Sequence, residues 1–159
     1  MNGGRWQNPK HPYHLQLSQN LLYCNKPELG SFEYLYGQSL SYVKKYNQHY
    51  VLCGEGTEHP GSSSLNNEKR KGAYFCAGCG TKLFESSTKY ESGSGWPSFF
   101  QSLPDVFETK IDYYMGYPRT EYHCKKCGGH HGHIFEDGPK PSGKRYCNNG
   151  ICLVFKEEM

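Results

Sequence analysis

The sequence contains none of the features that mark a secreted or membrane-spanning chain. No run of apolar residues approaches the ~20 that are needed to cross a bilayer. The N-terminus has no apolar signal-peptide segment, and no Asn-x-Ser/Thr acceptor for N-glycosylation occurs anywhere. These absences argue against a secreted scaffold held by disulfides, although the chain has eight cysteines. We therefore expect a soluble protein of a reducing compartment such as the cytoplasm.

An excess of charge of one sign is also missing. The formal net charge is only +3, and the lysines and arginines are scattered along the chain. So weak a basic excess argues against a nucleic-acid partner and is typical of a solvated face. Residues 1–27 contain no acidic residue, as in many transit peptides, but they hold one arginine and no clear amphipathic period. A mitochondrial location is thus the alternative to the cytoplasmic one.

Length and composition define one domain of ordinary size. The 159 residues are 35% hydrophobic and 15% aromatic, which is enough to bury one modest core. Residues 1–38 are rich in Asn, Pro, Tyr and Gly without steady periodicity, which predicts an irregular N-terminal extension. Residues 39–159 are expected to form the single domain.

Within this domain a helix is predicted over residues 39–52, where apolar side chains recur at helical spacing. The residues that approximate one helix face are Leu40, Val43, Tyr46, Tyr50 and Val51. Residues 54–67 contain several glycines, a proline and three consecutive serines, which predicts a surface loop.

From residue 73 onward the chain consists of short aromatic or β-branched segments that are cut by glycine and proline. This pattern predicts a mainly β fold of two antiparallel sheets of short strands, preceded by a helical or irregular N-terminal segment. The expected strands cover residues 73–75, 82–84, 107–114, 122–123, 133–135, 145–147 and 153–155.

Two Cys-x-x-Cys pairs, Cys76 with Cys79 and Cys124 with Cys127, point to a zinc site. Such a turn directs two thiolates at one tetrahedral ion, and the glycine after each pair suits a tight metal-binding turn, or knuckle. The 44 residues between the pairs predict that the knuckles come from separate hairpins. Two disulfides or a redox-active Cys-x-x-Cys pair are the alternatives. A closed four-sulfur Zn²⁺ site has no open position, so its role is expected to be structural.

Reaction chemistry is therefore expected elsewhere, and Cys147 is the candidate nucleophile. On an extended strand the side chains of Arg145, Cys147 and Asn149 project to one face, which places a cation and an amide beside the sulfur. His130 and His133 supply imidazoles that exchange protons near neutral pH. The alternatives are a buried, inert cysteine and histidines that lie at the surface or bind a metal.

Several motifs, taken in order, resemble those of the B-type methionine-R-sulfoxide reductases. The resemblance covers residues 42–156, including Gly-Thr-Glu at 56–58. The motifs are Lys-Tyr-Glu-Ser-Gly-Ser-Gly-Trp-Pro-Ser-Phe at 89–99, Cys-x-x-Cys-Gly-x-His-x-Gly-His-Ile-Phe at 124–135, Glu-Asp-Gly-Pro at 136–139 and Gly-Lys-Arg-Tyr-Cys-x-Asn at 143–149.

This resemblance implies an oxidoreductase that returns the R epimer of methionine sulfoxide in proteins and peptides to methionine. It implies that Cys147 attacks the sulfoxide sulfur and becomes a sulfenic acid, which thioredoxin or another thiol reduces. His130 and His133 would bind or protonate the sulfoxide oxygen. Residues 39–159 would then be the catalytic domain, and we expect a monomer.

The resemblance also implies roles for the residues around the thiol. Trp96 would form an apolar wall for the substrate methyl group, and the alternative is a tryptophan of the core. Arg145 and Asp137 would pair and set the field around the sulfur. Asn149 would be the amide that closes the site.

The chain departs from the family pattern in the way the enzyme is regenerated. Many members carry a second, resolving cysteine where this chain has Ser94. Cys152 is a poor substitute, because five strand residues span about 16 Å and an odd separation turns the side chains to opposite faces. Cys24, Cys53 or an external thiol remain as candidates. Further departures are His131, in place of the usual leucine, and Asn148, Gly150 and Ile151 after the nucleophile.

Two other classes of protein fit parts of the pattern. A zinc-ribbon binding module needs only the four knuckle cysteines and exposed aromatic side chains. A Cys/His hydrolase would use Cys147 as an acylated nucleophile and His133 as its base. Of the three, only the reductase consumes a thiol reductant.

Overall fold

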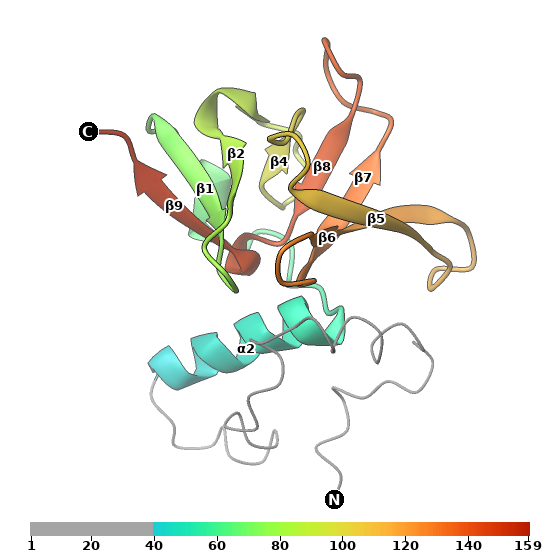
Figure 1. Ribbon diagram of the computed structural model, residues 1–159, viewed down its shortest axis with the longest axis horizontal. Helices are drawn as coiled ribbons and strands as arrows, with labels where there is room; N and C mark the ends of the chain where they lie inside the picture. Colours follow the sequence, from blue (N-terminus) through green and yellow to red (C-terminus); the bar gives the residue numbers. More distant parts are fainter. Residues whose placement is uncertain (1–39) are drawn as a thin grey trace, which may run out of the picture.

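The computed structural model describes residues 40–159, so the irregular extension expected over residues 1–38 lies outside the described residues. Helix α2 lies beside two sheets of short strands (Figure 1). The helices are α2 (Leu40–Gly54), η2 (Ser64–Asn67), η3 (Ser86–Thr88) and η4 (Gly150–Cys152). The strands are β1 (Gly72–Cys76), β2 (Lys82–Glu85), β3 (Lys89–Tyr90), β4 (Ser98–Phe99), β5 (Phe107–Asp112), β6 (Arg119–Cys124), β7 (His130–Phe135), β8 (Arg145–Asn148) and β9 (Leu153–Glu157).

The strands form two antiparallel sheets, which confirms the predicted mainly β fold. One sheet has the order β2-β1-β9 and the other the order β3-β4-β8-β7-β6-β5. All seven segments expected as strands are present, although most begin or end a few residues from the predicted positions. Strands β3 and β4 were not predicted, because two residues are too few to show an alternating pattern.

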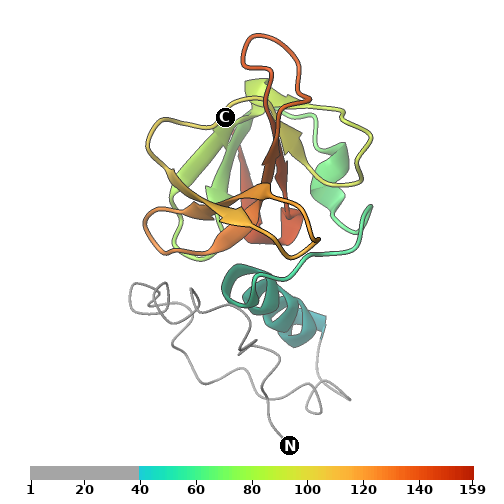
Figure 2. The same cartoon turned by 90° about the vertical axis from the view of Figure 1, so that its right-hand side faces the viewer.

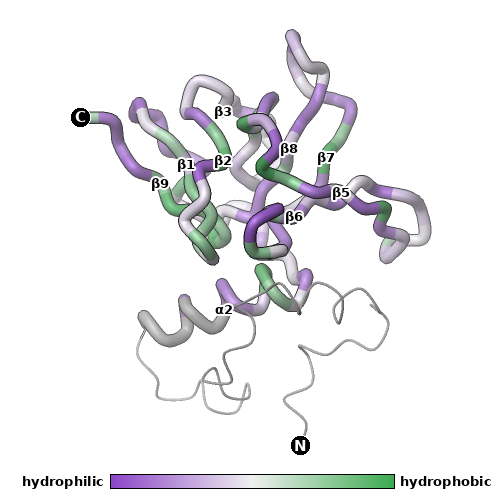
Figure 3. Tube along the Cα trace, in the orientation of Figure 1, coloured by the Kyte–Doolittle hydropathy of each residue, from purple (hydrophilic) through white to green (hydrophobic). Residues whose placement is uncertain are grey.

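Aromatic rings fill the core of the domain. Tyr74, Phe84, Phe99 and Tyr122 are fully buried, and the rings of Phe84 and Phe99 stack with their centroids 4.0 Å apart. Each buried ring contributes about 1.5–3 kcal/mol to stability. Figure 3 shows hydrophobic residues concentrated on β1, β2 and β9. The short strands are thus held together by their large side chains.

Helix α2 confirms the helix predicted over residues 39–52 and forms a separate layer below the sheets (Figure 2). Its last turn packs Leu52 against the turns of both Cys-x-x-Cys pairs. A Cβ atom on Gly78 would lie 3.6 Å from the Leu52 side chain, and one on Gly129 only 2.8 Å from it. The Gln48 side chain also donates to the carbonyl of Ile151 with Nε2–O 2.9 Å. The helix therefore supports the two knuckles from below.

The larger sheet brings chemically active residues into one row. Ser98 on β4 is paired with Cys147 on β8, which is paired with His133 on β7. His133 is in turn paired with Glu121 on β6, and Glu121 with Lys110 on β5. Because directly opposed residues in an antiparallel sheet project to the same face, all five side chains lie on one side of it.

Candidate metal centre and active site

The four knuckle cysteines come together from two hairpins, as predicted. One knuckle is the turn between β1 and β2, and the other is the turn between β6 and β7. The N–H of Gly80 donates to the carbonyl of Cys76 with N–O 2.7 Å, and the N–H of Gly128 to that of Cys124 with N–O 2.6 Å. Both glycines have φ near +70°, a conformation that costs other residues energy. This explains the glycine after each pair.

The sulfur atoms are spaced as a tetrahedral ion requires. The four ligand atoms lie within 4.8 Å of one another. Sγ of Cys76 is 3.7 Å from Sγ of Cys127, and Sγ of Cys79 is 3.5 Å from Sγ of Cys124. Zinc–sulfur bonds of ~2.3 Å in a tetrahedron separate the sulfurs by about 3.8 Å. All four cysteines are free of disulfides, so the structure contains no disulfide at these pairs.

The pKa values of the four thiols are also consistent with a site for a cation. Hydrogen bonds from neighbouring thiols, Cys124 first, raise the pKa of Cys76 far above its ordinary value. A hydrogen bond with Cys76 lowers the pKa of Cys79 to about 6. Four adjacent thiols therefore cannot all ionise without a cation, whereas a bound metal ion would stabilise all four thiolates.

His131 lies beside the four cysteines and not on the face of the sheet that carries Cys147. Its ring is fully buried among Phe107 and Tyr122, and its Nε2 lies 3.3 Å from Sγ of Cys76. Burial lowers the pKa of His131 to about 3, so the imidazole is neutral. A neutral ring can donate its N–H to a thiolate ligand. His131, which replaces the leucine usual in the family, thus places a polar side chain beside the four cysteines.

Cys147 is half-buried at the centre of the six-stranded sheet. Burial raises the pKa of the thiol, and this effect outweighs the opposing effects of the nearby Arg145 cation and a hydrogen bond with Ser94. The Ser94 hydroxyl belongs to a cluster in which Ser92 Oγ lies 2.8 Å from that of Ser94 and 2.6 Å from that of Ser98. At rest, the sulfur is therefore a protonated thiol next to a cation and a hydroxyl.

Arg145 lies two residues before Cys147 on β8 and forms a two-pronged ion pair with Asp137. Its Nε and Nη2 are 2.8 and 3.0 Å from the two carboxylate oxygens. The guanidinium carbon also lies 4.3 Å from the centre of the Phe135 ring. Two contacts fix the direction of the cation beside the thiol.

Each imidazole expected near the thiol contacts a carboxylate that sequence reasoning missed. His133 Nε2 lies 2.9 Å from Oδ2 of Asp112, and His130 Nδ1 lies 2.5 Å from Oε1 of Glu121. The centroids of the two histidine rings are 5.7 Å apart. Burial lowers the pKa of His133, so its imidazole is neutral near pH 7. Alternation along residues 119–124 puts Glu121 on one face, but only the strand pairing shows which histidines share it.

Trp96 is half-buried on the loop before β4. Its indole Nε1 donates to the carbonyl of Glu58 with N–O 3.1 Å. The carbonyl of Gly95 accepts hydrogen bonds from the Gly61 N–H and the Asn66 side chain, which anchor the loop. The ring is thus held at one edge and keeps part of its surface exposed.

Asn149 is buried behind the strand and does not continue the Arg145–Cys147 face. β8 ends at Asn148, and Asn149 precedes the short helix η4. Its side-chain nitrogen donates to the carbonyl of His131 with N–O 3.0 Å, and its oxygen accepts from the Glu58 N–H with N–O 3.0 Å. The Glu58 carboxylate accepts from the N–H groups of Gly150 and Ile151. Asn149 therefore joins the segment of Glu58 and the strand of His131 to the end of the strand that carries Cys147.

Among residues 40–159, the two cysteines that remain, Cys53 and Cys152, are not arranged as partners of Cys147. Cys152 is fully buried against Val51 and Leu52, with its Sγ 3.4 Å from the carbonyl oxygen of His130. Cys152 therefore packs in the core. Cys53 is buried and disulfide-bonded. Cys24 lies outside the described residues.

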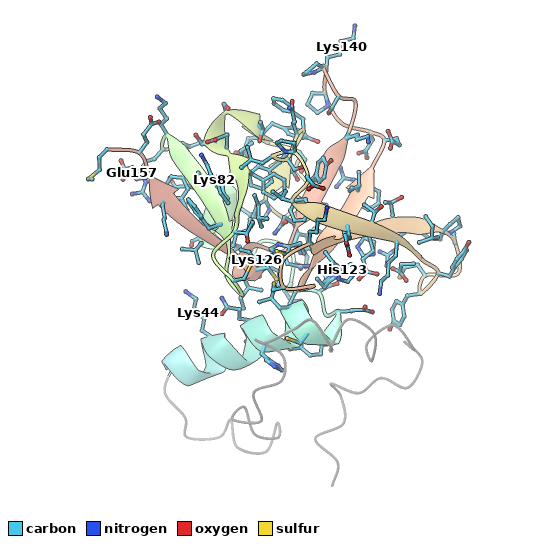
Figure 4. All side chains as sticks on the ribbon, in the orientation of Figure 1. Lys44, Lys82, His123, Lys126, Lys140 and Glu157 are labelled. Carbon is cyan, nitrogen blue, oxygen red and sulfur yellow. The ribbon has the colours of Figure 1, made fainter. Side chains whose placement is uncertain are left out.

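Figure 4 shows the crowded interior of the two sheets, with His123 and Lys126 near the β6–β7 turn above helix α2. Within residues 40–159, no helix has the length and apolar character needed to cross a membrane.

A two-sheet β domain in which four cysteines could hold a metal ion, with Cys147 paired to His133 elsewhere in the larger sheet, defines the class of protein. The chain belongs to the SelR domain family, whose model matches residues 45–157. It is 51% identical over 112 residues to the peptide methionine sulfoxide reductase MsrB of Leptospira interrogans serogroup Icterohaemorrhagiae serovar Lai, with 70% of this chain and 86% of that protein aligned. The MsrB of Methanosarcina barkeri is 52% identical over 114 residues, which cover 70% of this chain and 79% of the relative.

A plant relative shows the same similarity. The chain is 46% identical over 112 residues to peptide methionine sulfoxide reductase B1, chloroplastic, of Oryza sativa subsp. japonica, covering 70% of this chain and 52% of that protein. The resemblance to B-type reductases is thus confirmed, and the family is one of oxidoreductases.

Proposed function

We propose that this protein reduces the R epimer of methionine sulfoxide in peptides and proteins, with Cys147 as the nucleophile. The observation that carries this proposal is the register of β8 with β7, which pairs Cys147 with His133 in a chain that belongs to the SelR family. The relatives' names support the substrate class. The identity of the nucleophile rests on the cation, the hydroxyl and the imidazole that surround this thiol.

The reaction balances as a two-electron reduction of the sulfoxide. The Cys147 sulfur attacks the sulfoxide sulfur, and the oxygen is protonated and transferred to the cysteine. The products are methionine and a Cys147 sulfenic acid. A thiol then attacks the sulfenic sulfur, which releases water and forms a disulfide, and a second thiol reduces that disulfide to restore Cys147.

Because the pKa of Cys147 is raised, the resting thiol holds the proton that the sulfoxide oxygen needs. The resting thiol carries a proton that it must lose to become nucleophilic, and the sulfoxide oxygen must gain one. The imidazole of His133 or His130 can accept the proton of the thiol and deliver a proton to the sulfoxide oxygen. Such proton transfer contributes typically ~10²–10⁴-fold to a rate. The proton removed from the nucleophile is then the one that activates the leaving oxygen.

The other site residues position these groups. Arg145, held by Asp137, favours the ionised form of the sulfur. The exposed part of Trp96 offers an apolar surface for the substrate methyl group. Asn149 fixes the turn that follows the nucleophile.

An external thiol is the regenerating reductant that the described residues favour, either thioredoxin or a small thiol. Ser94 occupies the family's resolving position and cannot form a disulfide. Cys152 is enclosed in the core and Cys53 is already bonded.

Zn²⁺ is the ion that we propose for the centre formed by the four knuckle cysteines. An all-sulfur tetrahedral donor set suits zinc, which when bound would cross-link the two hairpins. No step of the reaction passes through the ion. We further propose that residues 39–159 act as a monomeric catalytic domain, with a cytoplasmic rather than mitochondrial location.

A diastereomer-resolved assay tests the proposal. The wild-type protein with dithiothreitol should reduce a peptide that contains methionine-R-sulfoxide and leave the S epimer unchanged. Cys147→Ser should abolish the activity, while Cys152→Ala serves as a control that removes a cysteine outside the site. Turnover of an ester or amide without reductant, or activity that persists in Cys147→Ser, would contradict the proposal.

A further inference from the structure

We propose that Glu121 and Asp112 are positioning residues, each of which fixes the orientation and tautomer of one imidazole near Cys147. Glu121 acts on Nδ1 of His130, and Asp112 acts on Nε2 of His133. This leaves Nε2 of His130 and Nδ1 of His133 for proton exchange. This inference rests on the function proposed above and extends it to two residues outside the motifs that carry the family resemblance.

The pair formed by Glu121 and His130 lies almost completely inside the protein. Glu121 is 3% exposed and His130 is 1% exposed. Oε1 of Glu121 is 2.5 Å from Nδ1 of His130, although the geometry departs from that of a well-aligned hydrogen bond. The other nitrogen, Nε2, has no hydrogen-bond partner among residues 40–159. Because Nδ1 is the nitrogen that faces the Glu121 carboxylate, Nε2 is the nitrogen of this ring that is left for proton exchange.

The pair formed by Asp112 and His133 has the opposite arrangement. Nε2 of His133 is 2.9 Å from Oδ2 of Asp112, and Nη2 of Arg119 lies 2.6 Å from the same oxygen. The other carboxylate oxygen, Oδ1, accepts the backbone N–H of Tyr114 with N–O 2.7 Å. These partners fix the carboxylate at the end of β5. His133 donates through Nε2 and keeps Nδ1 available.

The Glu121 carboxylate is held from several directions. Nε2 of His123 lies 3.0 Å from Oε1, and Nδ1 of the same ring lies 3.1 Å from the carbonyl oxygen of Gly128. Nζ of Lys110 lies 3.6 Å from Oε2. Burial alone would raise the pKa of Glu121, but hydrogen bonds with His123 and His130 bring it well below its usual range. The carboxylate is thus ionised and can only accept hydrogen bonds.

An ionised carboxylate determines which nitrogen of a facing neutral imidazole carries the hydrogen. The nitrogen beside the carboxylate is the donor, so the other nitrogen presents a lone pair. Both imidazoles lie on β7, which pairs with the strand that carries Cys147. We propose that such a lone pair accepts the proton of the thiol and passes it to the sulfoxide oxygen. Removing the carboxylate charge would allow the wrong tautomer and a rotated ring, while leaving substrate contacts in place.

A bound cation is the alternative occupant of this cluster. The ligand atoms of Glu121, His123 and His130 all lie within 4.8 Å of one another. However, two ligands bound at ~2.1 Å and at right angles would lie about 3.0 Å apart. The 2.5 Å between Nδ1 of His130 and Oε1 is shorter than this. The nearby Lys110 ammonium also repels a cation. A proton between the two atoms fits the distances better.

The test combines kinetics with the tautomer of each ring. Glu121→Gln and Asp112→Asn should each lower kcat roughly 10–100-fold with little change in KM, as is typical when a hydrogen-bond partner behind an active group is lost. Glu121→Asp should recover part of the loss. Glu108→Gln removes an exposed carboxylate of β5 and should have wild-type kinetics. In ¹⁵N-labelled protein, His130 should be protonated at Nδ1 and His133 at Nε2, and each matching variant should change its own ring.

Several outcomes would overturn the inference. One is a wild-type spectrum with the opposite tautomers, which needs no variant to fold. Another is unchanged kcat and tautomer in Glu121→Gln. A third is a second equivalent of zinc in the wild-type protein that Glu121→Gln loses, which would make the cluster a metal site. If the wild-type protein reduces no sulfoxide, the proposed function fails, and the ¹⁵N shifts still decide whether the carboxylates set the tautomers.

Discussion

The ionisation of a single thiol would limit the chemistry that we propose at Cys147. Burial raises its pKa even though Arg145 lies beside it. A free cysteine has a pKa of about 8.5, so at pH 7 this thiol should be ionised less than a free one. The rate of alkylation by iodoacetamide should therefore rise roughly tenfold per pH unit through pH 8. It should level off only above the pKa of a free cysteine.

Mass spectrometry of the Cys147 peptide after timed alkylation measures this rate. Arg145→Met should move the profile to still higher pH, because the variant loses the cation that favours the thiolate. The buried thiol of Cys152 provides an unreactive reference within the same sample. A profile that is already flat between pH 6 and 8 would show that the resting sulfur is a thiolate.

His131 offers a second residue whose role can be measured separately. Its neutral ring lies 3.3 Å from Sγ of Cys76 and can donate to that sulfur once a metal is bound. Leucine in its place would keep much of the packing but lose the donor. We expect His131→Leu to release zinc to a chelator roughly 10–100-fold faster than the wild-type protein. His131→Gln retains an N–H donor and should release zinc at an intermediate rate, as a colorimetric chelator would show. Equal rates for all three proteins would exclude the contact.

The two hairpins that carry the knuckles depend on one another. β1 and β2 belong to the smaller sheet, and β6 and β7 to the larger one, so a metal at the four cysteines would join both sheets. Cys76→Ser should therefore lose the metal and about 4 kcal/mol or more of stability. This corresponds to a fall in Tm of roughly 10 °C or more.

Cys147→Ser is the matched control, because it removes a thiol from the larger sheet and leaves the four knuckle cysteines unchanged. Calorimetry together with metal analysis would compare the two variants. Full metal content and an unchanged Tm in Cys76→Ser would contradict a structural metal. Loss of activity in zinc-depleted protein that keeps its fold would contradict it as well.

Local sequence patterns predicted most elements but not how they pair. Helix α2 shows apolar side chains at helical spacing, and β1, β6 and β9 are rich in aromatic or β-branched residues. The pairing of β6 with β7 is irregular between Tyr122 and His123, with His130 rather than His131 opposite His123. This irregularity turns His131 toward the metal centre. Such a bulge leaves no local signal, because it depends on two strands at once.

At the scale of the whole molecule, the site gathers residues from segments far apart in the chain. The motifs gave Cys147, Arg145, Asp137, His130 and His133 as candidates from residue type and order. They did not identify Asp112 and Glu121, because a carboxylate before a turn or within a strand is most often a solvated side chain. Only the strand order β8-β7-β6-β5 brings these two acids next to the histidines. Long-range register is the information that local patterns lack.

The same arrangement predicts that this protein can be given an internal resolving thiol. Ser94 hydrogen-bonds with Cys147, so a sulfur at that position would lie within reach of a disulfide. After one turnover without reductant, Ser94→Cys should form a disulfide between the introduced thiol and Cys147, whereas the wild-type protein should retain a sulfenic acid that dimedone traps. Non-reducing peptide mapping would identify both products. Ser92→Cys is the matched control, since the Ser92 hydroxyl contacts Ser94 and Ser98. An equal yield of disulfide from both variants, or none from Ser94→Cys, would show that the loop before Trp96 does not bring this position to the nucleophile.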